Sequence, residues 1–259
     1  MSLIEFRNIS KRFGRQVVLN GVNLYVDEGK CLVILGASGS GKSVMLKHLV
    51  GLLQPDAGEV WFDGRRIDNL PERTLSELRI QFGFLFQMGA LFDSMNVEDN
   101  VGFPLVEHSK KSPAQIHDIV SQKLRMVGLP TVGKKMPGEL SGGQRKRVAL
   151  ARAIALDPRV IIYDEPTTGL DPIRSDVINE LILKLQREMN VTSIVVTHDM
   201  HSALKVADRI VMLHEGQLIF DGTPTDIRNT ENPIVKRFVN GEAGEEELAG
   251  LRETPTKDN

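Results

Sequence analysis

The sequence predicts an α/β fold whose central sheet is largely parallel. An apolar run at residues 31–35, with a glycine directly after it, is typical of a strand buried on both faces. Further apolar runs at 160–163, 192–197 and 210–213 predict more strands, and a helical pattern lies between the first two of these. Strands that alternate with helices indicate layers packed around a parallel sheet.

The N-terminal part predicts strands and one helix. Residues 3–10 alternate apolar and polar side chains, and residues 17–26 follow the turn-like Phe13-Gly14-Arg15, so both ranges are expected to be strands. Residues 42–53 predict a helix, because their apolar side chains recur at spacings of three and four. Short strands are expected from there to residue 70, followed by an apolar run at 82–86.

Residues 88–158 predict a mainly helical insert, with helices at 113–127 and 141–156. The helix after the strand at 160–163 has a clear start signal, since Asp171 can cap it and a proline follows. The last residues, 241–259, hold six acidic and two basic side chains, which is typical of a solvated segment. We therefore expect one domain over residues 1–240 and a flexible acidic tail.

Composition and charge narrow the class of protein. The chain has 32 basic and 34 acidic side chains, a balance that argues against a non-specific nucleic-acid binder. It has no apolar stretch long enough to span a bilayer, and its start does not resemble a signal peptide. The one cysteine, Cys31, cannot form an internal disulfide and falls in a predicted buried strand. We expect an intracellular chain in a reducing compartment, with no nucleic-acid partner.

Residues 36–43 match the phosphate-binding loop G-x-x-x-x-G-K-S. The glycines let successive backbone N–H groups point at phosphate oxygens, and the helix that follows adds its positive dipole end. Lys42 can reach the β- and γ-phosphates, and the Ser43 hydroxyl can ligate Mg²⁺. A flexible linker is the plainer interpretation, but a buried strand before the motif and a helix after it favour nucleotide binding. The predicted nucleotide contacts are Gly36, Ser38, Gly39, Ser40, Gly41, Lys42 and Ser43.

Two acids follow the predicted strand at 160–163. Ligands of open α/β sheets bind beyond the carboxyl ends of the strands, which is where Asp164 and Glu165 stand. Asp164 suits a contact to Mg²⁺, directly or through water. Glu165 suits a general base, or an orienting group, for a water that attacks the γ-phosphate. A charged turn after a strand is common, but with a phosphate loop upstream the pair favours hydrolysis over binding alone.

A second glycine pair precedes the Ala-rich helix, in Ser141-Gly142-Gly143-Gln144. Ser-x-x-Gln is a capping box, which alone explains a helix start. Each glycine, however, costs about 1 kcal/mol of helix propensity relative to alanine. Three cations also crowd the positive end of the helix dipole. These features suggest that an anion binds from outside, although a solvated charged face remains open for the cations Arg145, Lys146 and Arg147.

The ordered set of motifs resembles the ATP-binding cassette (ABC) ATPases. L-S-G-G-Q at 140–144 lies about 100 residues after the phosphate loop and shortly before I-I-Y-D-E-P at 161–166. The resemblance covers about residues 3–240. It implies a P-loop NTPase core of the ABC type, with an N-terminal antiparallel β part and a helical subdomain inserted at about 88–158.

The resemblance also implies roles for residues that would not attract attention singly. Gln87 looks like the glutamine that senses the γ-phosphate and Mg²⁺ and contacts the permease. His198 looks like the switch histidine that contacts the γ-phosphate, and Asp171 looks like the D-loop aspartate. Phe13 falls where the family usually has a tyrosine that stacks on adenine, and phenylalanine keeps the π-face. Alone, each has a plainer interpretation as a polar loop residue, a structural histidine, an N-cap or a core aromatic.

Members of this family work as pairs of nucleotide-binding subunits that face each other head to tail. Each ATP lies between the phosphate loop of one subunit and the signature motif of the other. The resemblance therefore implies ATP and Mg²⁺ as cofactors and a second copy of this chain as a partner. It also implies a separate membrane permease, with the chain on the cytoplasmic face of a bacterial inner membrane. The helical insert is expected to present the docking groove, with Gln87 at its hinge.

The cargo is suggested by resemblance alone. The stretch at 84–101, its continuation to residue 108 and the end at 235–243 resemble the ATPases of MCE-type, maintenance-of-lipid-asymmetry phospholipid systems. This implies phospholipid transport with an MCE-domain lipid-binding partner. A motor for a polar solute, such as an amino acid or phosphate, is a second possibility. A non-transport cassette protein is a third. Cassette proteins of DNA repair and translation usually carry two cassettes, or zinc or coiled-coil inserts, which this chain lacks. A cell-division scaffold is the non-transport cassette protein that the length of this chain does not exclude.

Overall fold

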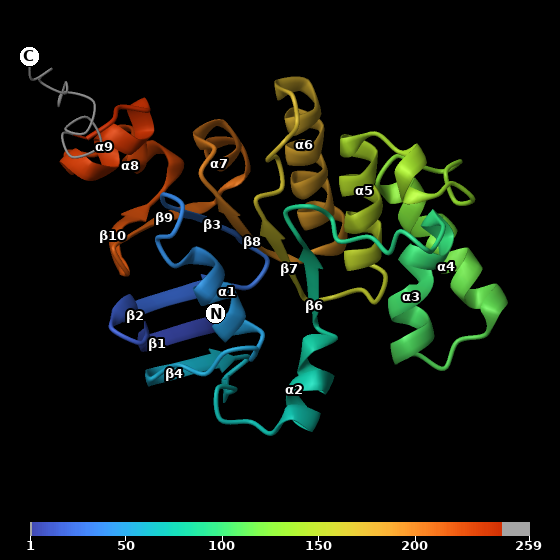
Figure 1. Cartoon of the computed structure of the whole chain (residues 1–259), viewed down its shortest axis with the longest axis horizontal. Coiled ribbons are helices and arrows are strands. Elements are labelled where there is room, and N and C mark those ends of the chain that lie inside the picture. Colours follow the sequence, from blue (N-terminus) through green and yellow to red (C-terminus); the bar gives the residue numbers. More distant parts are fainter. Residues whose placement is uncertain (1, 245–259) are drawn as a thin grey trace, which may run out of the picture.

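The computed structural model of the protein describes residues 2–244. The N-terminal part forms an antiparallel sheet, as predicted (Figure 1). The strand order in this sheet is β2-β1-β4-β5. Its strands are β1 (Ser2–Phe13), β2 (Gln16–Asp27), β4 (Ala57–Phe62) and β5 (Arg65–Arg66). Within the described residues, no helix combines the length and apolar character that crossing a bilayer requires.

A second sheet has six strands in the order β10-β9-β3-β8-β7-β6. These strands are β3 (Cys31–Leu35), β6 (Phe82–Leu85), β7 (Val160–Asp164), β8 (Thr192–Thr197), β9 (Arg209–His214) and β10 (Gln217–Gly222). All neighbours are parallel except β9 and β10, which are antiparallel. The predicted parallel core therefore carries one antiparallel edge strand.

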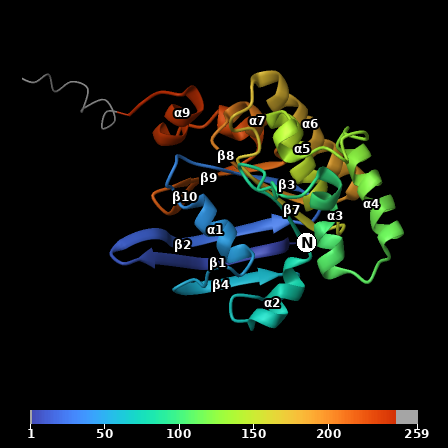
Figure 2. The same cartoon turned by 45° about the vertical axis from the view of Figure 1, so that its right-hand side comes forward.

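Helices cover both faces of this sheet. On β3, Cys31, Val33 and Leu35 face a cluster to which α5, α6 and α7 contribute. Leu32 and Ile34 face a second cluster that contains apolar side chains of α1 and of the antiparallel sheet, so α1 lies between the two sheets (Figures 1 and 2). The helices are α1 (Lys42–Leu49), α2 (Glu72–Arg79), α3 (Val97–His108), α4 (Pro113–Met126), α5 (Gly142–Ala153), α6 (Pro172–Met189), α7 (Met200–Val206), α8 (Pro224–Arg228) and α9 (Pro233–Asn240).

The helices α3, α4 and α5 pack on one another beside β6. They lie on the opposite side of the molecule from α8 and α9 (Figure 1). In the chain they fall between β6 and β7, where the helical insert was predicted. The domain limits themselves remain a prediction, and the tail from residue 245 onward lies outside the described residues.

A few elements differ from the prediction. The helix α1 ends at Leu49 instead of residue 53, because Gly51 takes a left-handed φ of 65° that closes the helix. The Leu52 N–H then donates to the Lys47 carbonyl at 2.9 Å. Several elements were not predicted individually, namely β10 and the helices α2, α3, α7, α8 and α9. Of these, α2 is short and mostly polar, and β10 is a half-exposed edge strand.

Candidate functional site

The carboxyl ends of four parallel strands bring the predicted catalytic residues to one edge of the sheet. The loop 36–43 follows β3, His198 follows β8, Glu165 follows β7, and Gln87 lies two residues beyond β6. The strands end in register, with the pairs Leu35–Thr197, Val195–Tyr163 and Tyr163–Leu85. Residues far apart in the sequence thus lie on neighbouring strands at the edge where ligands of α/β sheets bind.

The phosphate loop can only be built with glycine at its two ends. A Cβ on Gly36 would stand 2.4 Å from the carbonyl oxygen of Leu213. Gly41 has a φ of 105°, and a Cβ there would stand 2.9 Å from the Val18 carbonyl oxygen. Gly41 also precedes α1 without a capping side chain, so the N–H groups at the start of α1 receive no side-chain acceptor. This is the backbone of an anion site.

Two polar groups in the loop suit a phosphate ligand. The Ser40 hydroxyl oxygen is buried and has no hydrogen-bond partner among the described residues. The Lys42 ammonium is buried and donates to the carbonyls of Gly36 at 2.6 Å and Ala37 at 2.9 Å. Burial lowers the pKa of Lys42, and the nearby Glu165 and Asp164 partly offset this. A phosphate would satisfy the hydroxyl and give the cation an anionic partner.

Glu165 is held in an unusual conformation beside the loop. Its φ is 50°, in the left-handed region that residues other than glycine seldom adopt. The backbone N–H donates to the Val196 carbonyl at 2.9 Å, and Oε2 accepts from the Thr168 hydroxyl at 3.0 Å. Oε1 lies 2.9 Å from Nδ1 of His198. The carboxylate is therefore fixed on both oxygens, and its side chain is only 13% exposed.

Asp164, at the end of β7, is half-buried next to Glu165. Burial raises the pKa of Asp164, the charge of Glu165 raises it further, and Lys42 lowers it. Because the Asp164 carboxylate lies beside the negative charge of Glu165, a bound cation would stabilise its ionised form. The Ser43 hydroxyl is exposed at the start of α1, so an oxygen donor is available on that side of the site as well.

The second glycine pair lies at the start of α5, where the predicted capping box is confirmed. The Ser141 hydroxyl accepts from the Gln144 N–H, and the Gln144 side chain accepts from the Ser141 N–H. Neither Gly142 nor Gly143 has a positive φ. A Cβ at either position would meet only ordinary contacts, at 3.7 Å and 3.6 Å. The fold of this chain therefore does not require glycine here, in contrast to the phosphate loop.

Three other predicted site residues are exposed at the surface. Gln87 is exposed in the turn after β6. Asp171 caps α6 and accepts from the Arg174 N–H at 3.0 Å, so its predicted role as an N-cap is confirmed. Phe13 ends β1 at the hairpin and is 49% exposed, so it is not part of the core. The structure leaves the functional roles of all these residues as predictions.

One cation organises the site in a way that was not predicted from the sequence. Lys146 is buried, and its ammonium donates to the carbonyls of Glu165 at 3.3 Å, Pro166 at 2.7 Å and Thr168 at 2.7 Å. It thus links α5 to the loop that carries Glu165. The sequence did contain an indication of this burial: Lys146 lies three and four residues before Ala149 and Leu150, so it shares their buried face of α5.

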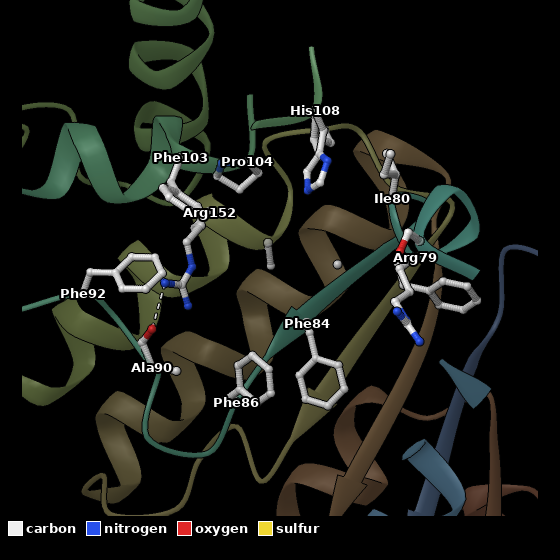
Figure 3. Close-up of a pocket in the computed structure, with 15 residues that line it drawn as sticks. Arg79, Ile80, Phe84, Phe86, Ala90, Phe92, Phe103, Pro104, His108 and Arg152 are labelled. Atoms are coloured by element: carbon white, nitrogen blue, oxygen red, sulfur yellow. Dashed lines mark hydrogen bonds between the residues drawn. The ribbon is translucent and has the colours of Figure 1, made fainter. Parts of the chain in front are cut away.

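A groove of about 560 Å³ opens between α2, β6, α3 and α5 (Figure 3). Phe86, which directly precedes Gln87 in the chain, lines it. Its walls are aromatic: Phe84 and Phe86 stack with ring centroids 4.2 Å apart, and Phe92 and Phe103 lie 4.9 Å apart. Phe86 and Phe92 are exposed. An exposed aromatic groove of this kind marks a surface suited to an apolar partner.

Comparisons with known proteins agree with this geometry. The family described as "ABC transporter" matches residues 19–168. A relative from Mycobacterium leprae, named "Probable ribonucleotide transport ATP-binding protein mkl", is 44% identical over 92% of this chain and 69% of its own length. A relative from Haemophilus influenzae, named "Intermembrane phospholipid transport system ATP-binding protein MlaF", is 44% identical over 93% of this chain and 92% of its own length.

Among solved structures, the "Dimeric structure of a post-hydrolysis state of the ATP-binding cassette MJ0796 bound to ADP and Pi" is similar in fold. It is 34% identical, has a TM-score of 0.78, and the match covers 85% of this chain and 98% of that one. This similarity confirms the predicted fold class.

Proposed function

The chain belongs to the ABC transporter family, as its motifs suggested, and we propose that it is the ATP-hydrolysing subunit of a phospholipid transport system. The observation that carries the hydrolytic part is the convergence at one sheet edge of the phosphate loop with Glu165 and His198. The loop supplies N–H donors and Lys42 for the phosphates. Glu165, after β7, and His198, after β8, would then lie beside the γ-phosphate of the bound nucleotide.

The nucleotide would be held mainly by residues 36–43, with the Phe13 ring available to stack on the adenine. The residues that would hold Mg²⁺ are Ser43, Gln87 and Asp164. Their hydroxyl, amide and carboxylate oxygens are hard donors, which suit this ion. When bound, Mg²⁺ neutralises phosphate charge. The raised pKa of Asp164 fits a carboxylate placed to receive a cation.

Glu165 would orient and deprotonate the attacking water. Its Oε2 accepts from Thr168 and its Oε1 faces His198, so the carboxylate cannot rotate freely. Fixing a catalytic group in this way lowers the reorganisation required for reaction. His198, with its side chain 58% exposed, can face both the carboxylate and the γ-phosphate.

A second copy of the chain would complete each site. Gly142 and Gly143 are not required by this chain's own packing, yet they cost helix propensity. Their N–H groups and the start of α5 can instead face a phosphate held by the partner copy, with Ser141, Gln144 and Asp171 around it. The dimeric state of the ATP-binding cassette MJ0796 supports this arrangement.

Phospholipid is the cargo that the relatives support best. The MlaF relative, whose name specifies phospholipid transport, matches this chain over nearly the full length of both. The mycobacterial relatives, whose name specifies ribonucleotide transport, are longer, and the chain spans about two thirds of them. Their name makes a polar solute the second candidate.

A membrane permease would dock through an apolar segment in the aromatic groove beside Gln87. The chain would thereby lie on the cytoplasmic face of the inner membrane, held through that permease, and an MCE-domain lipid-binding protein would be a further partner. The exposed rings of Phe86 and Phe92 supply the apolar surface for docking.

The test is to capture the tagged full-length chain with its companions from detergent-solubilised membranes and to reconstitute the complex in vesicles. We expect ATP-dependent movement of a fluorescent phospholipid, which the Glu165→Gln variant abolishes. ATP-dependent uptake of a ribonucleotide without phospholipid movement would favour the second candidate. Capture of the chain without any permease would contradict both.

A further inference from the structure

The helix α5 is bound to the rest of the chain by a cation at each end. At its first turns, Lys146 donates to three carbonyls of the loop 165–168. At its last turn, Arg152 donates to the carbonyl of Ala90 at 2.8 Å (Figure 3) and to the carbonyl of Gly89 at 2.9 Å. The guanidinium also lies 5.6 Å from the centre of the Phe92 ring. The loop after β7 and the segment after Gln87 are thus both attached to one helix.

Both cations hold a residue in a strained backbone conformation. Ala90 has a φ of 48° and Glu165 a φ of 50°, although neither is glycine. Such residues are destabilised by about 1–3 kcal/mol and persist only where surrounding contacts fix them. The carbonyl of Ala90 accepts from Arg152, and the carbonyl of Glu165 accepts from Lys146. Backbone strain held by specific donors is a feature of positions that take part in function.

The two ends of this connection lie in the two sites already described. Arg152, Ala90 and Phe92 line the aromatic groove. Of the three carbonyls that Lys146 binds, the one at 3.3 Å belongs to Glu165 itself. Lys146 and Arg152 are six residues apart, about 9 Å along a helix at 1.5 Å per residue. A Cβ on Gly89 would stand 3.4 Å from the Ala149 Cβ, so the segment after Gln87 also packs directly on α5.

We propose that α5 transmits occupation of the groove to the hydrolytic carboxylate of the same chain, through Arg152 at one end and Lys146 at the other. Both are positioning residues, because neither is placed to touch nucleotide. A segment that docks in the groove presses on the surface that Arg152 and Phe92 form and shifts α5. Lys146 carries that shift to the backbone of Glu165. This inference rests on the proposed docking of a permease in the groove.

The test uses the reconstituted complex and the isolated chain, and the readout is the ratio of their kcat values for ATP hydrolysis. The variants are Lys146→Gln, Arg152→Gln and the double variant. Lys184→Gln is the matched control, since Lys184 also donates to a backbone carbonyl of another element, that of Met126 at 2.9 Å, but away from both sites. Thermal unfolding and ATP affinity are measured on every variant.

We expect each single variant to lower the ratio at least fivefold, with the KM for ATP changed less than twofold. The double variant should lower it no further than the more severe single variant, because both residues act in one connection. Lys184→Gln should stay within twofold of wild type. If the glutamine variants unfold, Lys146→Arg and Arg152→Lys, which keep the cations, should retain at least half of the ratio.

Three results would overturn the inference while leaving the proposed function intact, and two of them concern the Lys146 and Arg152 variants. The first is a wild-type ratio in both single variants, and the second is a double variant whose loss equals the product of the single losses. A wild-type complex in which the permease gives no stimulation would contradict the proposed docking itself. Equal losses in Lys184→Gln would show that any weakened contact has the same effect, and would also overturn the inference.

Discussion

The imidazole Nδ1 of His198 lies 2.9 Å from the carboxylate Oε1 of Glu165. The two residues are 33 positions apart in the sequence and follow neighbouring parallel strands, β8 and β7. Their contact is therefore a product of sheet register, and it joins the two groups that we expect to act on the attacking water and the γ-phosphate.

This contact predicts that the two side chains act as a unit. Glu165→Gln and His198→Ala should each lower kcat by about 10²-fold or more, the range typical of a lost acid–base group. The double variant should be no slower than the slower single variant, because one removal already disables the pair. Steady-state ATP hydrolysis measures all three. Losses that multiply would mean that the residues act independently.

Lys42→Ala should weaken ATP binding by at least tenfold. The Lys42 ammonium is buried among the loop carbonyls. Alanine at this position would leave the loop without a cation to bind the phosphates. Lys47→Ala, on the exposed face of the same helix α1, is the control and should bind ATP as wild type does. Titration with a fluorescent ATP analogue checks both. Equal affinity in the two variants would refute our interpretation of the phosphate loop.

Gly143→Ala should separate stability from function. The added Cβ meets only ordinary contacts, and alanine favours a helix by about 1 kcal/mol over glycine, so Tm should stay the same or rise. ATP hydrolysis should nevertheless fall at least tenfold, because a partner-bound phosphate would lose close access to the backbone.

Gly138→Ala is the matched control for this prediction. A Cβ at Gly138 meets nothing within 4 Å, and the residue lies just before the same helix. Its activity should stay within twofold of wild type. Full activity in Gly143→Ala would mean that no phosphate of a partner copy binds close to the backbone at the start of α5.

Cys31 should not react with thiol reagents at pH 8 while the protein is folded. Burial raises the pKa of the Cys31 thiol, and the Asp208 carboxylate raises it further, so almost no reactive thiolate forms. Reaction with Ellman's reagent should become stoichiometric only in denaturant. Fast labelling of the native chain would contradict the burial of β3.

The nucleotide side of the site could be predicted from the sequence because local patterns encode it. The phosphate loop and the capping box at Ser141 depend on residues close together in the chain, and the structure reproduces their geometry. The strand at 31–35 was predictable as well, since an unbroken apolar run fits a strand with both faces covered.

The parts that escaped prediction depend on long-range contacts. Lys146 resembled an exposed cation in an unfavourable position, and only the approach of the loop 165–168 turns it into a buried donor. The positive φ of Glu165 and Ala90 is likewise imposed by neighbouring elements. The edge strand β10 and the short helix α2 have weak patterns, since much of each remains exposed.

The most direct test of the account is the mass of the Glu165→Gln variant with saturating Mg²⁺ and ATP, measured by light scattering after size exclusion. Two copies should associate around bound ATP and remain together, since hydrolysis can no longer release them. The same sample with ADP should be monomeric. A Glu165→Gln chain that binds ATP yet stays monomeric, even with its permease present, would contradict the shared-site mechanism.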